Sequence, residues 1–228
     1  MIKVRNVSKS FDGRAVLRKA DLTIEAGRII GLYGKSGIGK STLAKILCGV
    51  LRPDTGSIHH IDGKLLYSDN TVYDRRAGLK IQMVYQQPYS SLDPSQRIYN
   101  GLSELIRYHR FSKDKAQTEQ IIFTLIESVG LDRDILNHLP HQISGGEAQR
   151  IAIARCLLFK PSLLILDEAT SMLDVSTQAN VIALVKRMTA EHNGSVLMIS
   201  HDPELINYLC DQIYVFDNNH ELKERTTK

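Results

Sequence analysis

Short apolar runs recur along the chain and predict β-strands. The first run alternates polar with apolar residues, whereas several later runs are continuous, which is typical of central strands covered on both faces. The predicted strands are Ile2–Val7, Asp21–Ile24, Ile29–Tyr33, Lys80–Tyr85, Leu163–Leu166, Ser195–Ile199 and Gln212–Phe216.

Apolar positions at helical spacing lie in the segments between most of these strands. Strands that alternate with helices predict an α/β fold built on a mostly parallel sheet, and the short early strands predict an added antiparallel layer. The predicted helices are Lys40–Gly49, Ser95–Tyr108, Asp114–Ser128, Gly146–Phe159, Ser176–His192 and Pro203–Leu209.

Residues 87–140 contain no strand pattern and predict an inserted α-helical subdomain. A chain of 228 residues is long enough for a single domain, 1–228, with one sizeable core and such an insertion. We expect the core with its β layer to comprise 1–86 and 141–228, and a helix from about residue 144 to pack with the subdomain as well. The polar end, Asn218–Lys228, is predicted to be frayed, or short and loosely docked.

Composition excludes several classes of protein. The hydrophobic fraction of 43% and charged fraction of 24% are ordinary for a globular chain, and a net charge of +4 is too small to favour a nucleic-acid partner. No apolar run approaches the roughly 20 residues of a membrane span, and Met1–Val7 resembles a strand more than a secretory signal, so a cytoplasmic location is expected. An odd number of widely spaced cysteines, Cys48, Cys156 and Cys210, predicts buried thiols outside disulfides and metal clusters.

A glycine-rich segment after the strand Ile29–Tyr33 fits the phosphate-binding pattern G-x-x-x-x-G-K-[ST]. A turn with no ligand is the alternative, which the strand before it and the helix after it disfavour. We expect the N–H groups from Gly37 to Thr42 to face the α- and β-phosphates, Lys40 to bridge the β- and γ-phosphates, and Ser41 to ligate Mg²⁺. The segment reads Gly34-Lys35-Ser36-Gly37-Ile38-Gly39-Lys40-Ser41.

Two carboxylates, Asp167 and Glu168, follow the apolar strand Leu163–Leu166. Carboxylates are poor choices at a buried strand end unless it opens into a site. We expect Asp167 to hold Mg²⁺ through its water shell, and Glu168, which should point the other way, to orient and deprotonate a water molecule. A merely solvated strand end is the alternative, which the phosphate-binding pattern in the same chain disfavours.

A second glycine-rich segment, Ser144-Gly145-Gly146-Glu147, stands before the helical stretch 148–155. Together they resemble the signature segment of ABC-type ATPases, the ATP-binding subunits of ABC transporters. The resemblance covers nearly the whole chain. It implies a P-loop NTPase fold with a mostly parallel core sheet, an antiparallel β layer and an inserted helical subdomain, and it implies ATP and Mg²⁺ as ligands.

Four single residues match other elements of that family, in the order in which the family has them. The resemblance implies that Phe11 stacks on adenine and that Gln86, in the loop joining the two lobes, ligates the metal. It also implies that Asp174 lies in the loop that crosses the dimer, and that His201 touches the γ-phosphate during catalysis.

The signature predicts a second phosphate site in the same chain. Ser144 and Gly146 are expected at a helix N-terminus, where N–H groups and the helix dipole favour an anion. One chain cannot easily close both of its sites on one ATP, so the resemblance implies a head-to-tail dimer. Each ATP would then be bound by Lys40 of one subunit and Ser144 of the other.

The chain departs from the family pattern at Ile38, Glu147 and Ala169. The family more often has small polar residues or proline at the first and last of these positions, and glutamine at the second. An added carboxylate near a γ-phosphate would weaken closure by about 1 kcal/mol if solvent screens it. Our hypothesis is that the ATP site completed by this signature is less active than its partner site.

The segments Gln86–Pro94 and Pro140–Gln142 are similar to importers of the dipeptide, oligopeptide and nickel family. Since many peptide importers have a further C-terminal extension, the chain looks more like the second ATPase of a nickel or metal-chelate importer. The implied partners are two permeases, a paralogous ATPase or a second copy, and an extracellular binding protein, at the cytoplasmic face of the membrane. His59 and His60, in a predicted edge hairpin, are not expected to bind metal.

Three alternatives stay open. The first is an ATPase of an oligopeptide or dipeptide importer. The second is a soluble ABC ATPase that acts on nucleic acid or ribosomes, although no coiled-coil insert, second cassette or basic arm supports it. The third is a module that holds ATP without turnover, which Glu168 and His201 disfavour.

Overall fold

The computed structural model describes most of the chain and divides it into two compact units. It describes residues 1–60, 65–68, 71, 73–74, 78–169, 175–191 and 193–225. The first unit comprises Met1–Met83, Lys160–Glu168 and Met188–Lys228, and the second comprises Val84–Phe159 and Ala169–Arg187. The boundary expected near residues 87 and 140 stays a prediction.

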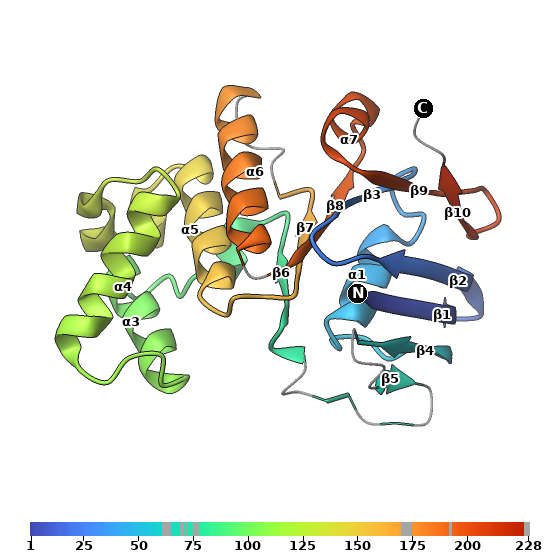
Figure 1. The fold of residues 1–228 in the computed structure, drawn as a ribbon, viewed down its shortest axis with the longest axis horizontal. Helices are drawn as coiled ribbons and strands as arrows, with labels where there is room; N and C mark the ends of the chain where they lie inside the picture. Colours follow the sequence, from blue (N-terminus) through green and yellow to red (C-terminus); the bar gives the residue numbers. More distant parts are fainter. Residues whose placement is uncertain are drawn as a thin grey trace. The chain divides into compact units, whose positions relative to one another are not determined.

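A six-stranded sheet forms one layer of the first unit (Figure 1). Strands β3, β8, β7 and β9 pair in parallel, and β10 is antiparallel to β9. Every predicted apolar run after residue 28 forms one of these strands, which confirms the expectation of a mostly parallel sheet. In spatial order the strands are β10 (Leu222–Arg225), β9 (Gln212–Phe216), β3 (Ile29–Tyr33), β8 (Ser195–Ser200), β7 (Leu163–Asp167) and β6 (Ile81–Val84).

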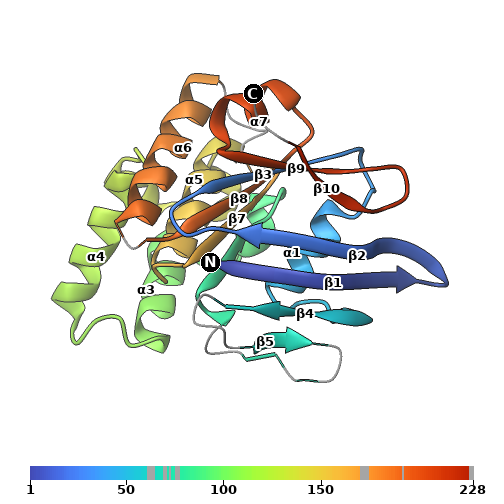
Figure 2. The ribbon, with the colours of Figure 1, turned by 45° about the vertical axis from the view of Figure 1, so that its right-hand side comes forward.

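A four-stranded antiparallel sheet forms a second layer of this unit (Figure 2). Its first two strands extend past the predicted runs, because a hairpin continues the pairing up to Phe11 opposite Arg14. Asp12 and Gly13 close this hairpin with φ angles of 49° and 76°. In spatial order the strands are β2 (Arg14–Ile24), β1 (Ile2–Phe11), β4 (Thr55–His59) and β5 (Leu65–Ser68).

Helix α1 (Lys40–Leu47) packs into the core that the two sheets share. Its apolar face, which includes Leu43 and Leu47, is fully buried together with Val4 of β1 and Leu32 of β3. Burial of each such side chain contributes about 1.5–3 kcal/mol, so the core fixes the helix that follows the glycine-rich segment.

Helix α7 (Pro203–Leu209) packs against β3 and β8. The packing is close, since a Cβ atom on Gly31 would lie 2.8 Å from Cγ2 of Ile206. Asp202 caps the helix by accepting hydrogen bonds from the N–H groups of Glu204 and Leu205. A glycine in the middle of β3 is therefore required by the helix above it.

After the end of β6, the secondary structure of the second unit is helical in the residues that the structure describes. Helix α3 begins later than predicted, because Ser95 donates to the Asp93 carboxylate from both its N–H and its hydroxyl, at 2.9 and 2.7 Å, and so forms a turn. The elements are η1 (Pro88–Ser91), α3 (Ile98–Tyr108), α4 (Lys115–Ser128), η2 (Arg133–Asn137), η3 (Pro140–Gln142) and α5 (Gly145–Leu157), with the first part of α6 (Val175–Ala190).

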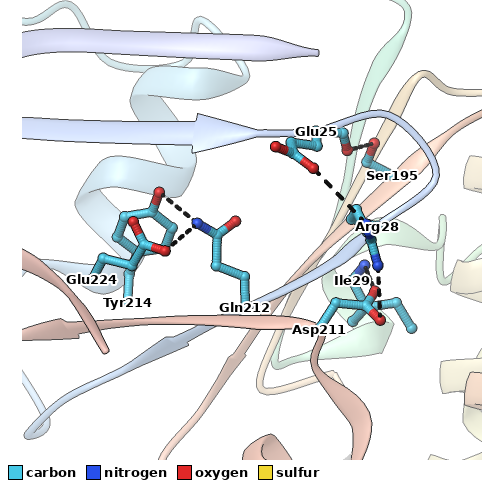
Figure 3. Close-up of polar contacts among 8 residues, drawn as sticks. All are labelled: Glu25, Arg28, Ile29, Ser195, Asp211, Gln212, Tyr214 and Glu224. Carbon is cyan, nitrogen blue, oxygen red and sulfur yellow. Dashed lines mark hydrogen bonds and ion pairs between the residues drawn. The ribbon is translucent and has the colours of Figure 1, made fainter. Parts of the chain in front are cut away.

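The polar end of the chain is ordered, and the expectation of a frayed or loosely docked tail is wrong as far as Arg225. Strand β10 pairs with β9, and the Gln212 amide donates to the Glu224 carboxylate at 2.8 Å and to the Tyr214 hydroxyl at 3.2 Å (Figure 3). Strand β10 lacks the apolar pattern from which a strand is predicted. It is held instead by its pairing with β9 and by polar side-chain contacts.

Polar contacts also fix the start of β3. The Asp211 carboxylate accepts from the N–H of Ile29 at 2.8 Å and lies 3.8 Å from the Arg28 guanidinium (Figure 3). The Ser195 hydroxyl donates to the carbonyl of Glu25 at 2.6 Å. The strand that leads into the glycine-rich segment is therefore held at its beginning by residues from the far end of the chain.

Candidate functional site

The register of the parallel strands brings three loops to one edge of the six-stranded sheet. Tyr33 is paired with Ser200, and Asp167 is paired with Ile199. Because all three strands run in the same direction, the residues that follow them emerge at the same carboxyl edge, where ligands bind in open α/β sheets. The glycine-rich segment, the two carboxylates and His201 therefore meet at this edge.

The glycine-rich segment forms a loop in which two glycines have positive φ angles, and at Gly39 a side chain would also clash. Gly37 and Gly39 have φ angles of 76° and 122°. A Cβ atom on Gly39 would lie 2.6 Å from the carbonyl oxygen of Val16. Helix α1 follows without a capping side chain and without an acidic residue in its first turn. No side chain caps its first N–H groups, which suits an anion, and their contact with phosphates stays a prediction.

Lys40 lies inside this loop, with only 5% of its surface exposed. Its ammonium group donates to the carbonyl oxygens of Gly34 at 2.7 Å and Lys35 at 3.0 Å. Burial lowers the pKa of Lys40, and the nearby carboxylates of Glu168 and Asp167 oppose that shift. A buried ammonium beside a ring of N–H groups is suited to an anion with several negative oxygens.

Asp167 and Ser41 form an oxygen-rich pair next to the loop. Burial raises the pKa of Asp167, whereas the hydrogen bond from the Ser41 hydroxyl acts to lower it. A hydroxyl and a carboxylate are hard oxygen donors of the kind that Mg²⁺ prefers. Ser41 and Asp167, two of the three residues predicted to bind the metal ion, are therefore suited to Mg²⁺. The third, Gln86, is an exposed residue after β6 in the other unit, and its role stays a prediction.

Glu168 adopts a left-handed backbone conformation, with a φ angle of 51°. Its N–H donates to the carbonyl of Ile199 at 3.0 Å, and its carboxylate lies 3.4 Å from Nδ1 of His201. The Glu168 side chain is 20% exposed and that of His201 is 67% exposed, so water reaches this pair. Strained backbone of this kind is concentrated at functional sites. A carboxylate here can accept a proton from water, while the imidazole holds its position.

Phe11 is not a core residue, although its residue type alone would favour that. It lies at the tip of the β1–β2 hairpin with 42% of its surface exposed. The ammonium of Lys9 lies 5.5 Å from the centre of the ring and 2.6 Å from the Asp54 carboxylate. An exposed ring held in this way offers a flat face for stacking, and its contact with adenine stays a prediction.

Ser144 caps helix α5 in the second unit, so the predicted helix start is confirmed to within one residue. The Glu147 carboxylate accepts from both the N–H and the hydroxyl of Ser144, each at 2.8 Å. These bonds lower the pKa of Glu147. Gly145 and Gly146 form the first turn. The N–H and hydroxyl of Ser144, expected near a phosphate, are therefore already engaged by a carboxylate of the same chain.

The remaining predictions concern Asp174, the two histidines of the predicted hairpin and the three cysteines. Asp174 lies outside the described residues. His59 contacts Ser57 and His60 contacts Ser162, and within the described ranges no group of three or more His, Cys, Asp or Glu side chains could hold a metal ion. None of the cysteines, Cys48, Cys156 and Cys210, forms a disulfide, and burial raises the pKa of the latter two to about 12.

Comparison with known proteins identifies the family. The family described as ABC transporter matches residues 17–171. The chain belongs to the ABC transporter ATPase family. This membership confirms the family resemblance and the prediction of an ATP-binding, ATP-hydrolysing cassette.

Two relatives match nearly the whole of this chain but differ in the share of their own length that it covers. The uncharacterized ABC transporter ATP-binding protein YejF of Escherichia coli K12 is 39% identical over 209 residues, which are 92% of this chain and 39% of YejF. The nickel import ATP-binding protein NikE of the same strain is 38% identical over 212 residues, 91% of this chain and 78% of NikE. The chain thus spans well under half the length of one relative and about three quarters of the other.

A solved structure confirms the predicted fold class. The dimeric ATP-binding cassette MJ0796, in a post-hydrolysis state bound to ADP and Pi, has a TM-score of 0.85 and 26% identity, covering 100% of this chain and 99% of that one. In the part of this cassette that the structure describes, no helix has the length and apolar character of a membrane span.

One contact of the glycine-rich loop was not predicted from the sequence. Nδ1 of His220, in the turn between β9 and β10, lies 3.2 Å from the carbonyl oxygen of Ile38 in the glycine-rich loop. The polar segment that contains His220 has no apolar period and no motif. The sequence therefore carries no signal that places this residue at the loop.

Replacing Asp167 with asparagine is expected to stabilise the nucleotide-free cassette. Because the folded-state pKa of Asp167 is raised, its contribution to stability is present below its unfolded pKa and is lost as pH rises through the folded value. The amide of asparagine is neutral at every pH, so the variant does not lose this stability as the pH rises. The unfolding midpoint at pH 7 should rise by about 2–4 °C, and magnesium-dependent nucleotide binding should weaken.

Differential scanning fluorimetry between pH 4 and 8 measures this effect. Asp54→Asn is the matched control, since the hydrogen bond from Lys9 lowers the pKa of Asp54 and the same substitution should lower the midpoint. A lower midpoint in Asp167→Asn at pH 7 would contradict the prediction.

Proposed function

We propose that this cassette is the ATP-hydrolysing subunit of an importer whose cargo is nickel or another metal chelate. The observation that carries the proposal is the meeting of the glycine-rich loop, Asp167, Glu168 and His201 at one sheet edge. The 38% identity to NikE, a nickel import ATP-binding protein, supports the cargo.

The loop residues bind and orient the triphosphate in this proposal. N–H groups from Gly37 to Thr42 hold the α- and β-phosphates, and the buried Lys40 ammonium bridges the β- and γ-phosphates. Ser41 and Asp167 would hold Mg²⁺, the latter through water. When bound, Mg²⁺ neutralises charge on the phosphate oxygens.

Glu168 acts as the general base in this proposal. It orients a water molecule, whose oxygen forms a bond to the γ-phosphorus while the bond to the leaving oxygen of ADP breaks. The carboxylate accepts the proton of the water. The products are ADP and inorganic phosphate. His201, 3.4 Å from the carboxylate, positions it and contacts the γ-phosphate.

Two copies of a cassette complete each site. The N-terminus of α5, with Ser144 as its cap, is a second anion site in each chain. We infer a head-to-tail dimer in which Ser144 of one subunit and Lys40 of the other bind the same ATP. The similar cassette MJ0796 is dimeric, which supports a dimer of cassettes. Asp174 would lie where the two subunits meet.

The further partners follow from the importer proposal. We infer two membrane permeases, an extracellular substrate-binding protein, and either a paralogous cassette or a second copy of this chain, with the cassette at the cytoplasmic face of the membrane. Gln86 and the helical unit would contact the permeases. An oligopeptide or dipeptide importer is the alternative. Action on nucleic acid has less support, because the net charge is only +4.

Co-expression with the two permeases and the binding protein tests the proposal. The complex should co-purify, and its ATP hydrolysis should be stimulated by nickel or a nickel chelate in the presence of the binding protein. The Glu168→Gln complex should show no such stimulation. Stimulation by peptides instead would favour the alternative importer, and stimulation by DNA or RNA without permeases would contradict an importer.

The Glu147→Gln variant is expected to close on ATP more readily than the native cassette. The native carboxylate engages the N–H and hydroxyl of Ser144 and carries a negative charge that opposes the γ-phosphate. A neutral amide can still cap the helix. The ATP concentration needed for dimerisation should fall by about fivefold, the equivalent of roughly 1 kcal/mol.

Light scattering against ATP concentration, in a hydrolysis-deficient background, measures dimerisation. Glu127→Gln is a control for charge alone, because Glu127 lies on α4 and pairs with Arg133. Equal ATP dependence of the native and Glu147→Gln proteins would contradict the hypothesis that this carboxylate weakens the site.

A further inference from the structure

The turn between β9 and β10 contacts the glycine-rich loop at several points. Nδ1 of His220 lies 3.2 Å from the carbonyl oxygen of Ile38. The Lys35 ammonium donates to Oδ1 of Asn218 at 3.4 Å. A Cβ atom on Gly34 would lie 3.2 Å from Cβ of Phe216. The end of β9 and the turn after it thus contact the loop at Gly34, Lys35 and Ile38.

The turn is itself held firmly. The Asp217 carboxylate accepts from the N–H groups of Asn219 at 2.9 Å and Glu221 at 3.1 Å, and it pairs with the Lys223 ammonium at 2.7 Å. The carbonyl of His220 accepts from the N–H of Arg18 at 3.0 Å, which joins the turn to β2. A turn fixed on both sides can hold a neighbouring loop in place.

His220 has a left-handed backbone conformation, which several other residues of this chain share. Its φ angle of 65° lies in the left-handed region, where glycine has no steric cost and asparagine a smaller one. The turn could form with either of those residues. The side chain of His220 contacts the carbonyl of Ile38, so a substitution that keeps the turn isolates this contact.

The contact has a consequence for the peptide between Ile38 and Gly39. A carbonyl oxygen can only accept, so Nδ1 of His220 must carry the hydrogen. In a planar trans peptide the C=O and the following N–H point in opposite directions. A donor that holds the carbonyl of Ile38 therefore turns the N–H of Gly39 to the opposite side of the peptide. Gly39, with a φ angle of 122°, is otherwise free to rotate this peptide.

We propose that His220 is a positioning residue for nucleotide binding: it holds the Ile38 carbonyl so that the Gly39 N–H faces the phosphates. The proposal rests on the proposed nucleotide site. His220 is 182 residues from Ile38 in the chain, and it acts through the peptide without touching the nucleotide.

Substitutions that keep the turn test this role. His220→Gly suits the left-handed backbone but has no donor, and His220→Asn suits it and keeps an amide donor. Asn219→Gly is the matched control in the same turn. A fluorescent ADP analogue reports affinity in the full-length chain. We expect His220→Gly to bind it about three- to tenfold more weakly, as for the loss of one hydrogen bond. His220→Asn should recover part of the affinity, and Asn219→Gly should bind like the native chain.

Two further measurements separate positioning from folding. The unfolding midpoint of nucleotide-free His220→Gly should equal or exceed the native value, since strain is relieved. Backbone amides of the loop peptide should exchange hydrogen faster in this variant. Native affinity in His220→Gly would overturn the proposal, as would a weakened affinity that tracks a lowered midpoint. If the native chain failed to bind the analogue, the proposed function itself would be contradicted.

Discussion

Replacing Glu168 with glutamine is expected to lower the rate of ATP hydrolysis by about a hundredfold or more, with ATP binding retained. Glutamine has nearly the same shape but cannot accept the proton of the attacking water. The Glu168 side chain lies 3.4 Å from His201 and is only 20% exposed, so the substitution removes a carboxylate whose position is well defined. The strained backbone at this residue suits glutamine and glutamate equally.

Single-turnover hydrolysis with excess protein measures the chemical step directly. Glu204→Gln is the matched control, because Glu204 is an exposed acid in the first turn of α7, beyond the same sheet edge. It should hydrolyse ATP at the native rate. With binding retained and hydrolysis blocked, Glu168→Gln should also accumulate as an ATP-bound dimer on size-exclusion chromatography. Native turnover in Glu168→Gln would mean that another group deprotonates the water.

Replacing Lys40 with methionine is expected to weaken ATP binding by about 10- to 100-fold, because a buried charge-assisted contact to the phosphates is lost. Methionine keeps most of the buried stem, so the loop should retain its fold. The native ammonium is held inside the loop by the carbonyls of Gly34 and Lys35, close to where the phosphates are expected.

Fluorescence titration with an ATP analogue gives the affinity, and circular dichroism checks that the fold is intact. Lys45→Met is the control, because Lys45 lies in the last turn of the same helix; since its charge also acts on the pKa of Asp167, both variants are titrated without Mg²⁺. It should bind ATP like the native chain. An equal loss in both variants would indicate damage to α1 instead of a lost phosphate contact.

The parts of the fold that could be predicted are those with a periodic apolar signal. Leu163–Leu166 and Ser195–Ile199 are continuous apolar runs, and both are fully buried strands in the sheet. The start of α5 was predictable because Ser144 and Glu147 form a capping box, whose pattern is local in sequence. Helix and strand signals of this kind depend on neighbouring residues alone.

The errors arise where long-range polar contacts replace that signal. Strand β10, Leu222–Arg225, is polar and exposed, and it is a strand because it pairs with β9. Helix α3 begins after the predicted residue, because the hydrogen bonds from Ser95 to Asp93 form a turn there. Neither the pairing of β10 with β9 nor the hydrogen bonds to Asp93 leaves an apolar repeat of 2 or 3.6 residues in the sequence. Neither could therefore be predicted from the hydrophobic pattern.

The chemistry of the site was predictable from local sequence, since a loop with Gly39 and Lys40 before a helix N-terminus matches the phosphate-binding pattern. The tertiary structure was needed to show that Glu168 faces His201, and that His220 reaches the loop from 182 residues away. The physical reason is that strand register and long-range hydrogen bonds choose these partners. Residues that meet in this way share no spacing along the chain.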